Sequence, residues 1–438
     1  MDNNRDTFGS RLGFILATIG FSVGVGTLWR FPYICREYGG GLFLLTYIIL
    51  MLVIGIPLFS AEVALGVATR KSPVGAYKSL ERAGTKWHIA GYFHMICIVL
   101  VLGYTIPVYG WILNYVFQTA KGTFTGMDSG QIADYFSLFT SNHLLVLGFM
   151  LLNVVLTALV VRKNLQQGIE KIAKVLLPTL AIIMIVLVIV GMRLEGASEG
   201  IKFIFSLDFE AFSLESILTA LGQTFFSLGI AMAVAMIFGS YQKEGEINVV
   251  KNSLIVSISV IFVAIMASMM IFPMASAFNL EMSSGPGLTF ITMPNVFNEM
   301  SGGRIWGTVF YIGFYIAAFS SGIAGWEAVM AFLMDQFKVS RIKALGIAFV
   351  LVMLVGIPAL LSDYLFNLFD MLTNNVFLIL GSLAISIFVG WIWGIPNLAQ
   401  VCGIRKGGTL YRFLEIMLKY ISPVIVVILC LSLFGIIK

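Results

Sequence analysis

Two short stretches of this sequence share one six-residue pattern and could bind small ions through their backbone. They are Phe21-Ser22-Val23-Gly24-Val25-Gly26 and Phe226-Ser227-Leu228-Gly229-Ile230-Ala231. Glycine favours an interruption of a helix, and an interruption leaves N–H and C=O groups without intrahelical partners. Free carbonyls can bind a cation or an ammonium group, whereas the N–H groups at the start of a half-helix suit a carboxylate. The two stretches therefore predict a site for a zwitterion, such as an amino acid, together with sodium ions.

Both stretches lie inside long apolar segments, which indicate what kind of protein must position them. The 438 residues are 59% hydrophobic and only 11% charged, with a mean hydropathy of +0.97, whereas a soluble domain is about half apolar and a quarter charged. Eleven apolar segments can cross a hydrocarbon layer of about 30 Å as helices, at 11–36, 40–69, 87–119, 143–161, 168–192, 214–240, 250–277, 304–336, 341–361, 365–396 and 413–437. They are too long and too uniformly apolar for barrel strands. The sequence predicts an all-α, polytopic membrane helix bundle, with 1–438 forming one domain in the lipid bilayer.

Lysine and arginine gather in alternate loops, and cytoplasmic loops carry an excess of these residues. The basic residues of these loops are Arg70, Lys71, Lys78, Arg82, Lys86, Arg162, Lys163, Lys171, Lys174, Lys338, Arg341, Lys343, Arg405, Lys406 and Arg412. The intervening stretch 193–215 is instead mainly acidic. We expect a cytoplasmic N-terminus, an uncleaved first helix and, with an odd helix count, a C-terminus outside. This topology explains the net charge of +5 without a nucleic-acid partner.

The two glycine-containing interruptions are five helices apart, in the first and the sixth segment. An odd offset reverses the direction of the chain, so two five-helix repeats, 11–192 and 214–396, would have inverted topology, with 413–437 as an extra helix. Such a pair of broken helices is typical of transporters whose binding site lies at the bilayer midplane. Unwound backbone is tolerated in a membrane only where protein, water or a ligand satisfies its polar groups.

These glycines have two other interpretations, as a helix-packing motif or as part of a hydrolase motif. Gly20 and Gly24 have the small-xxx-small spacing that lets helices pack closely, but packing alone does not explain why the pattern recurs in the sixth segment. The stretch 20–24 also matches the G-x-S-x-G nucleophile elbow of hydrolases. That motif needs a strand-turn-helix context and a histidine partner, whereas this copy lies inside an apolar span and the three histidines lie near helix ends.

Several motifs in this order resemble the neurotransmitter:sodium symporter family over nearly the whole chain. They are Arg11-Leu12-Gly13, Gly20 to Gly26, Trp29-Arg30-Phe31-Pro32-Tyr33, Gly39-Gly40-Gly41, Tyr47, Gly55-Ile56-Pro57-Leu58, Glu62, Gly222 to Leu228, Ser320-Ser321, Trp326-Glu327 and Asp335. The resemblance implies the leucine-transporter fold with broken helices 1 and 6. Eleven helices resemble a bacterial subgroup of amino-acid transporters.

By this resemblance, two sodium ions would bind at the broken helices. The second sodium site would use the carbonyls of Gly20, Val23 and Ala317 with the hydroxyls of Ser320 and Ser321. The first site would use Ser22, Thr27, Ser227 and Ser259, completed by the substrate carboxylate. Thr27 and Ser259 stand where the family usually has asparagines, and their hydroxyls remain competent ligands. Ser259 could equally bond its own helix backbone.

The resemblance also implies the residues that would hold the substrate. Its carboxylate would meet the N–H groups near Val25 and Gly26 and a tyrosine of the third helix, for which Tyr104 is the candidate if Pro107 makes a bulge that absorbs one extra residue. The full set of expected contacts is Ser22, Gly24, Val25, Gly26, Tyr104, Phe226, Ser227, Gly229, Met232, Ser321 and Gly325. Glycines and a pliable methionine predict a roomy apolar cavity. Such a cavity predicts a large hydrophobic or aromatic amino acid as substrate. Phe21 stands where an acid would pair with a biogenic amine, which argues against biogenic amines.

Charged residues inside or beside the spans are costly to place in a membrane, so each is a candidate functional residue. Arg30 with Asp370 resembles the family's extracellular gate, and Arg5 with Asp335 its intracellular gate, aided by Ser240 and Tyr241. Glu62 and Glu327 could anchor unwound backbone or carry a proton, and we favour a structural role. The family's chloride site would draw on Tyr47, Gln223 and Ser227, but Val263 occupies its deciding position, so chloride coupling stays open.

These features predict a sodium-coupled symporter of a neutral L-amino acid in a bacterial inner membrane, and not an enzyme. A relative coupled to protons or to exchange would be expected to lack the pair Ser320-Ser321. A channel should repeat a pore motif symmetrically, and a membrane enzyme needs a metal or acid-base cluster, neither of which the sequence shows. The oligomeric state stays open.

Overall fold

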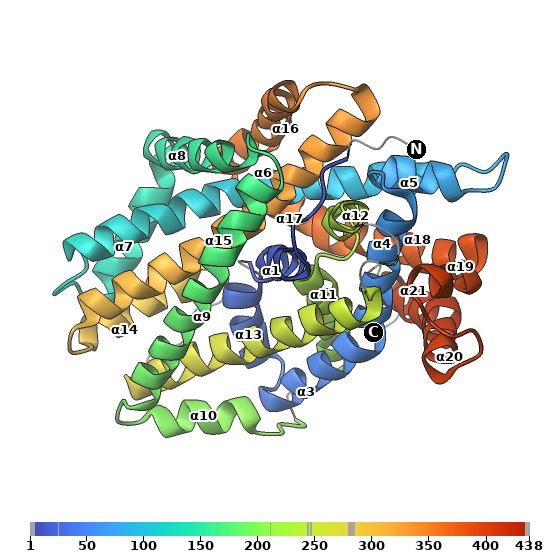
Figure 1. The fold of residues 1–438 in the computed structure, drawn as a ribbon. Helices are drawn as coiled ribbons and strands as arrows, with labels where there is room; N and C mark the ends of the chain where they lie inside the picture. The colour runs from blue at the N-terminus through green and yellow to red at the C-terminus, as the bar shows by residue number, and fades with distance from the viewer. Residues whose placement is uncertain are drawn as a thin grey trace.

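The structure, a computed structural model, describes residues 5–24, 26–210, 212–242, 245, 248–278 and 285–433. Within these ranges the regular elements are all helical, and the only extended pairing is an isolated antiparallel bridge between Gly40 and Leu207. The predicted all-α class is confirmed. Figure 1 shows α1 (Arg11–Ser22) near the centre of the view, with the other helices around it.

The chain up to residue 205 forms the first group of helices. In order, these are α1, the π-helical turn η1 (Gly26–Arg30), α2 (Phe31–Glu37), α3 (Gly41–Leu50), η2 (Met51–Gly55), α4 (Ile56–Thr69), α5 (Pro73–Leu80), α6 (His88–Lys121), α7 (Ser129–Ser141), α8 (His143–Val161), η3 (Gln166–Glu170), α9 (Lys171–Met192) and α10 (Ala197–Phe205).

The remainder of the chain forms a second group. It comprises α11 (Leu214–Leu228), α12 (Val234–Ser240), α13 (Val249–Ala277), η4 (Leu288–Thr292), α14 (Met293–Glu299), α15 (Gly303–Phe337), α16 (Arg341–Leu361), α17 (Asp363–Leu372), η5 (Thr373–Phe377), α18 (Leu378–Ile387), η6 (Phe388–Gly394), α19 (Ile395–Val401), α20 (Thr409–Ile416), η7 (Met417–Ile421) and α21 (Ser422–Leu433). The division into two inverted five-helix repeats stays a prediction.

Nine continuous helices among the described residues are long and apolar enough to cross a membrane, and each overlaps a predicted segment. A tenth span results if α1 and the helix Gly26–Glu37, which meet at 53°, are counted together. The sixth predicted segment consists of the two shorter helices α11 and α12. Thus the two predicted segments that are not single continuous helices are the two that carry the repeated glycine pattern.

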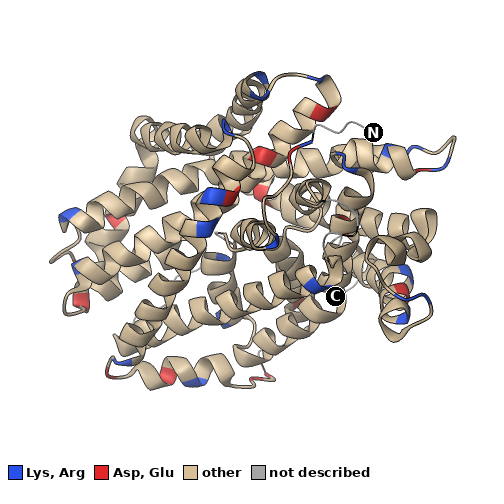
Figure 2. Cartoon of the chain, in the orientation of Figure 1, with Lys and Arg blue, Asp and Glu red and all other residues tan. Residues whose placement is uncertain are grey.

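The long helices divide into an inner and an outer set. The most apolar windows of α6 and α15 are 72% and 78% buried, whereas those of α8, the helix Gln166–Met192 and α16 are 33% buried. The outer helices expose large apolar side chains such as Leu144, Val175 and Leu354. Figure 2 shows that charged residues are few over the long helices. In water such surfaces would be costly, so the outer set is suited to contact lipid.

Backbone conformation ends α11 and begins α12. Gly229 adopts a left-handed conformation with φ +64° and caps α11, which is the usual role of glycine at a helix end. Ala231 and Ala233 also have positive φ, +64° and +65°. Such values are unfavourable for residues with a Cβ atom and persist only where surrounding structure imposes them. The residues that pack around segment 229–233 therefore maintain its non-helical backbone conformation.

Candidate functional site

A small cavity of about 40 Å³ lies where α1 and α11 end. Its lining comes from α1 and η1, from α6, from α11 and the segment after it, and from α15. The lining residues are Phe21, Ser22, Gly24, Gly26, Thr27, Val101, Thr105, Tyr109, Phe226, Ser227, Met232 and Ser321. The structure thus brings together seven of the eleven expected substrate contacts. Val25 lies outside the described residues.

Two phenylalanine rings account for the small volume of the cavity. A Cβ atom on Gly229 would lie 2.0 Å from the Phe21 ring, and one on Gly26 would lie 2.1 Å from the Phe226 ring. The rings therefore rest directly on glycine backbone. An apolar cavity that admits benzene measures about 150 Å³, so the expected roomy cavity is not open in this conformation, because the two aromatic side chains occupy the space that the glycines leave.

The third predicted helix contributes different residues from those expected. α6 runs without a break through Pro107, so no bulge shifts its register. Val101, Thr105 and Tyr109, four residues apart, line the cavity, as neighbours on one helix face do. Tyr104 is turned away by about a quarter turn and interacts with Asp370. Thr105 and Tyr109 are thus cavity residues that the sequence reasoning missed, because helical spacing groups them on one face of α6 but does not indicate that this face meets the cavity.

Gly325 is also absent from the cavity. A Cβ atom there would lie 2.8 Å from Leu102, so this glycine lets α15 approach α6 closely. Gly229 lies just behind the lining, under the Phe21 ring.

Oxygen atoms of the expected second sodium site meet between α1 and α15. The Ser320 hydroxyl lies 3.0 Å from the carbonyl oxygen of Gly20 and 3.0 Å from that of Ala317. Ser321 lies beside Gly24, because a Cβ atom on Gly24 would be 2.8 Å from the Ser321 hydroxyl. Val23 is fully buried at the end of α1. The carbonyls and hydroxyls assembled here are the hard oxygen donors that suit an alkali cation.

The expected first sodium site is only partly assembled. Thr27 donates a hydrogen bond of 3.0 Å to the carbonyl of Ser22, and both residues line the cavity with Ser227. The buried Ser22 hydroxyl has no hydrogen-bond partner among the described residues. Ser259 is half-buried and donates to the carbonyl of Ile255 in its own helix. Its hydroxyl satisfies its own backbone and does not line the cavity, which is the alternative that the sequence left open.

A polar group next to the cavity contains the residues expected at an anion site. The Gln223 amide donates to the carbonyl of Gly26 at 3.0 Å and to the Ser227 hydroxyl at 2.9 Å. The buried Tyr47 hydroxyl has no hydrogen-bond partner among the described residues. Val263 is half-buried and offers no polar atom. The arrangement links η1 to α11 through hydrogen bonds and leaves the question of chloride open.

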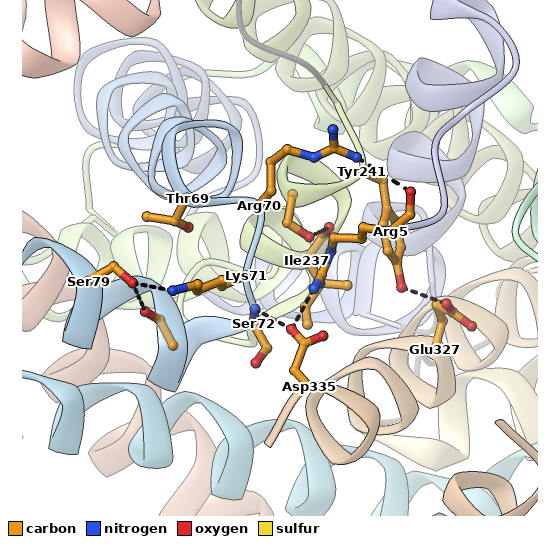
Figure 3. Close-up of polar contacts among 12 residues, drawn as sticks. Arg5, Thr69, Arg70, Lys71, Ser72, Ser79, Ile237, Tyr241, Glu327 and Asp335 are labelled. Carbon is orange, nitrogen blue, oxygen red and sulfur yellow. Dashed lines mark hydrogen bonds and ion pairs between the residues drawn. The ribbon is translucent and has the colours of Figure 1, made fainter. Parts of the chain in front are cut away.

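An ion pair and hydrogen bonds join the residues expected at the intracellular gate (Figure 3). Arg5 pairs with Asp335 at 2.5 Å, and the Asp335 carboxylate also accepts the backbone N–H of Ser72 at 2.7 Å. The Arg5 guanidinium lies over the Tyr241 ring, 5.1 Å from its centre. The Tyr241 hydroxyl donates to Glu327 at 2.6 Å. These contacts join the N-terminal segment to the start of α5, the end of α12 and α15.

Arg341 also belongs to this network, although the sequence analysis placed it only among the loop charges. Its guanidinium pairs with the fully buried carboxylate of Glu327 and also lies 3.8 Å from Asp6. Glu327 and Arg341 lie in different helices, α15 and α16, so helical periodicity does not predict their contact. Only the packing of the two helices brings the side chains together.

The pair expected at the extracellular gate is connected through a third residue. Arg30 bonds to the Asn374 side chain at 3.2 Å, and Asn374 donates to the Asp370 carboxylate at 2.9 Å. In the part of the chain that the structure describes, Arg30 and Asp370 do not form a direct ion pair. The Arg30 guanidinium also lies 5.3 Å from the centre of the Phe226 ring, which lines the cavity.

The chain matches known proteins along almost its full length. Residues 5–129 and 142–438 match the model of the sodium:neurotransmitter symporter family. An uncharacterized sodium-dependent transporter of Bacillus subtilis is 31% identical, with 98% of each chain covered, and the sodium-dependent serotonin transporter of Drosophila melanogaster is 26% identical over 99% of this chain and 77% of its own. The crystal structure of MhsT in complex with L-phenylalanine is similar with a TM-score of 0.90 and 32% identity, covering 98% of this chain and all of that one.

Proposed function

The chain belongs to the sodium:neurotransmitter symporter family, and on this premise we propose that it carries a neutral, large hydrophobic or aromatic L-amino acid into the cell, driven by sodium. As a family member with many apolar spans it is an integral membrane protein. A bacterial inner membrane is proposed, with the N-terminus inside because the basic loops mark the cytoplasmic side.

The contact of Ser320 with Gly20 carries the proposal. The Ser320 hydroxyl lies 3.0 Å from a carbonyl at the last turn before α1 ends. A sodium ion at this point would bind oxygen atoms from both helices and stabilise the conformation that holds them together. A ligand can shift a conformational equilibrium only through such a difference in affinity between the two states. Sodium binding would therefore be coupled to the position of α1.

The proposed substrate class rests on the cavity lining and on one relative. Phe21, Phe226 and Met232 are apolar or aromatic, and no carboxylate among the described residues lines the cavity, so an extra cationic group on the substrate would lack a partner there. The MhsT structure contains L-phenylalanine. Because Phe21 and Phe226 rest on glycine backbone, we propose that these rings swing away to admit the side chain of the substrate.

Transport would proceed by alternating access between the two gates. The cytoplasmic ion pairs Arg5–Asp335 and Arg341–Glu327 are formed. We propose that substrate and two sodium ions bind from outside, that the Arg30 gate closes over them, and that the cytoplasmic pairs then break. The N-terminal part of α1 would move away and release the ligands inside.

The test is uptake of radiolabelled phenylalanine, tyrosine, tryptophan, leucine and alanine into proteoliposomes. An inward sodium gradient is compared with matched potassium and proton gradients. We expect uptake only with sodium and an order that favours the large side chains. The double variant Ser320→Ala with Ser321→Ala should abolish sodium-driven uptake, whereas Ser137→Ala, in α7 and remote from the cavity lining, should leave it unchanged.

Uptake that does not depend on sodium but depends on a proton gradient would contradict the proposed sodium coupling and favour proton-coupled transport. A preference for alanine would show that the phenylalanine rings keep the cavity small, and would replace the proposed substrate class with small amino acids.

A further inference from the structure

The segment between α11 and α12 is held by side chains outside the cavity. At its centre is the backbone of Ala231, whose φ is +64°. The N–H of Ala231 donates to the Glu62 carboxyl of α4 at 3.0 Å, and its carbonyl contacts His94 Nδ1 of α6 at 2.9 Å. Unwound backbone in a membrane must find partners of this kind. Both polar groups of one strained residue are thus satisfied by side chains.

The partners of His94 determine which tautomer fits. A carbonyl can only accept, so His94 Nδ1 must donate its proton to Ala231. The other ring nitrogen, Nε2, lies 3.1 Å from the Tyr77 hydroxyl of α5. In the neutral imidazole Nε2 is then an acceptor, and the Tyr77 hydroxyl donates to it. One neutral tautomer therefore satisfies both contacts in a chain that runs from Tyr77 through His94 to Ala231.

Tight packing gives this chain little freedom. Tyr77 and His94 are fully buried, and the Phe388 ring packs edge-on against Tyr77 with centres 4.7 Å apart. On the other side, a Cβ atom on Gly381 would lie 2.5 Å from the Cβ of Ala231 and 3.3 Å from the His94 ring. The imidazole is therefore clamped between α5, α18 and the unwound segment.

We propose that His94 is a positioning residue for the transport site, which sets the orientation of the unwound segment through the carbonyl of Ala231. The peptide that this carbonyl belongs to continues into Met232, whose side chain lines the cavity. Loss of the hydrogen bond leaves a buried carbonyl without a donor and lets the segment rotate. The consequence for uptake rests on the proposed function, whereas the effect on the segment does not.

Three substitutions separate the two contacts of His94. His94→Phe keeps a ring but removes both hydrogen bonds. His94→Asn places an amide nitrogen at the position of Nδ1 and can still donate to Ala231, while it is too short to reach Tyr77. His94→Gln places its amide near Nε2 and favours Tyr77. His143→Phe, at the exposed start of α8, is the control for an added ring.

Two measurements on the full chain in lipid nanodiscs or proteoliposomes test the proposal. The first is amide hydrogen exchange of segment 229–233, and the second is the KM for sodium-driven uptake of L-phenylalanine. We expect His94→Phe and His94→Gln to raise both the exchange rate and the KM about tenfold, because an unsatisfied buried carbonyl is costly. His94→Asn should stay within about twofold of the unchanged protein.

Unchanged exchange and KM in His94→Phe would overturn the proposal. So would faster exchange spread evenly over α6 and α11, since that indicates a general loss of stability. If the unchanged protein takes up no L-phenylalanine, the proposed function fails for that substrate, and the exchange of segment 229–233 still decides the role of His94.

Discussion

The guanidinium of Arg341 pairs with the carboxylate of Glu327, and this contact joins the start of α16 to the buried face of α15. The same carboxylate accepts a hydrogen bond from Tyr241 at 2.6 Å. Tyr241 in turn contacts Arg5, the partner of Asp335. The residues of the proposed intracellular gate therefore form a network of two ion pairs bridged by one tyrosine.

Removing Arg341 alone should be more harmful than removing the whole pair. Arg341→Met leaves the buried Glu327 charge without its partner, which is expected to cost about 3–5 kcal/mol. The double variant Glu327→Gln with Arg341→Met removes both charges and should recover much of that loss. Thermal unfolding of the purified protein in one detergent provides the comparison. A double variant as unstable as the single one would contradict the pairing.

Breaking the Arg5–Asp335 pair should open the cytoplasmic side. Ser240 is fully buried at the end of α12, so a cysteine introduced there by Ser240→Cys reports access from the cytoplasm. Adding Asp335→Asn removes the charge of one partner and should increase the rate of maleimide labelling about tenfold, since a hydrogen bond to a charged group contributes about 1.5 kcal/mol and about 1.4 kcal/mol is a tenfold change in an equilibrium. Asp363→Asn, at the exposed start of α17, is the control. Equal rates in both variants would exclude Asp335 as a gate.

Thr105 and Tyr104 should differ in their effects although they are adjacent. Thr105→Val removes a hydroxyl from the cavity lining, and we expect it to raise the KM of sodium-driven uptake about fivefold because the lining loses an oxygen that can accept a hydrogen bond from the substrate. Tyr104→Phe removes the contact with Asp370 and should mainly speed the dissociation of bound substrate. Kinetics of uptake and of radioligand release separate these effects. The reverse pattern would restore Tyr104 as the carboxylate contact.

Gly229→Ala should abolish uptake. The new Cβ would lie 2.0 Å from the Phe21 ring, and φ at this position is +64°, which a residue with a Cβ atom adopts at a cost of about 1 kcal/mol. Adding Phe21→Ala removes the clash but not the backbone strain, so it should restore part of the uptake. Purified protein yield is measured in parallel. Full uptake by the single variant would show that the Phe21 ring moves freely.

The bilayer explains why much of the fold could be predicted from the sequence. Each span must satisfy its own backbone and expose apolar side chains to lipid, so segments such as 143–161 and 341–361 are evident from hydropathy alone. The repeated pattern around Ser22 and Ser227 also marked the interruptions, because unwound backbone in a membrane needs a special reason. Both features depend only on residues that are close together in the sequence, so they can be recognised without the structure.

The sequence by itself determined the helices, their two interruptions and the serines of the proposed sodium sites. Only the tertiary structure decided which face of α6 meets the cavity, so that Thr105 and not Tyr104 lines it. It also decided that Arg341 reaches Glu327 and that His94 reaches Ala231, 137 residues away. Such contacts depend on the orientation of each helix about its own axis and on its packing against its neighbours. Close packing fixes this orientation through side chains from many segments that are distant in the sequence.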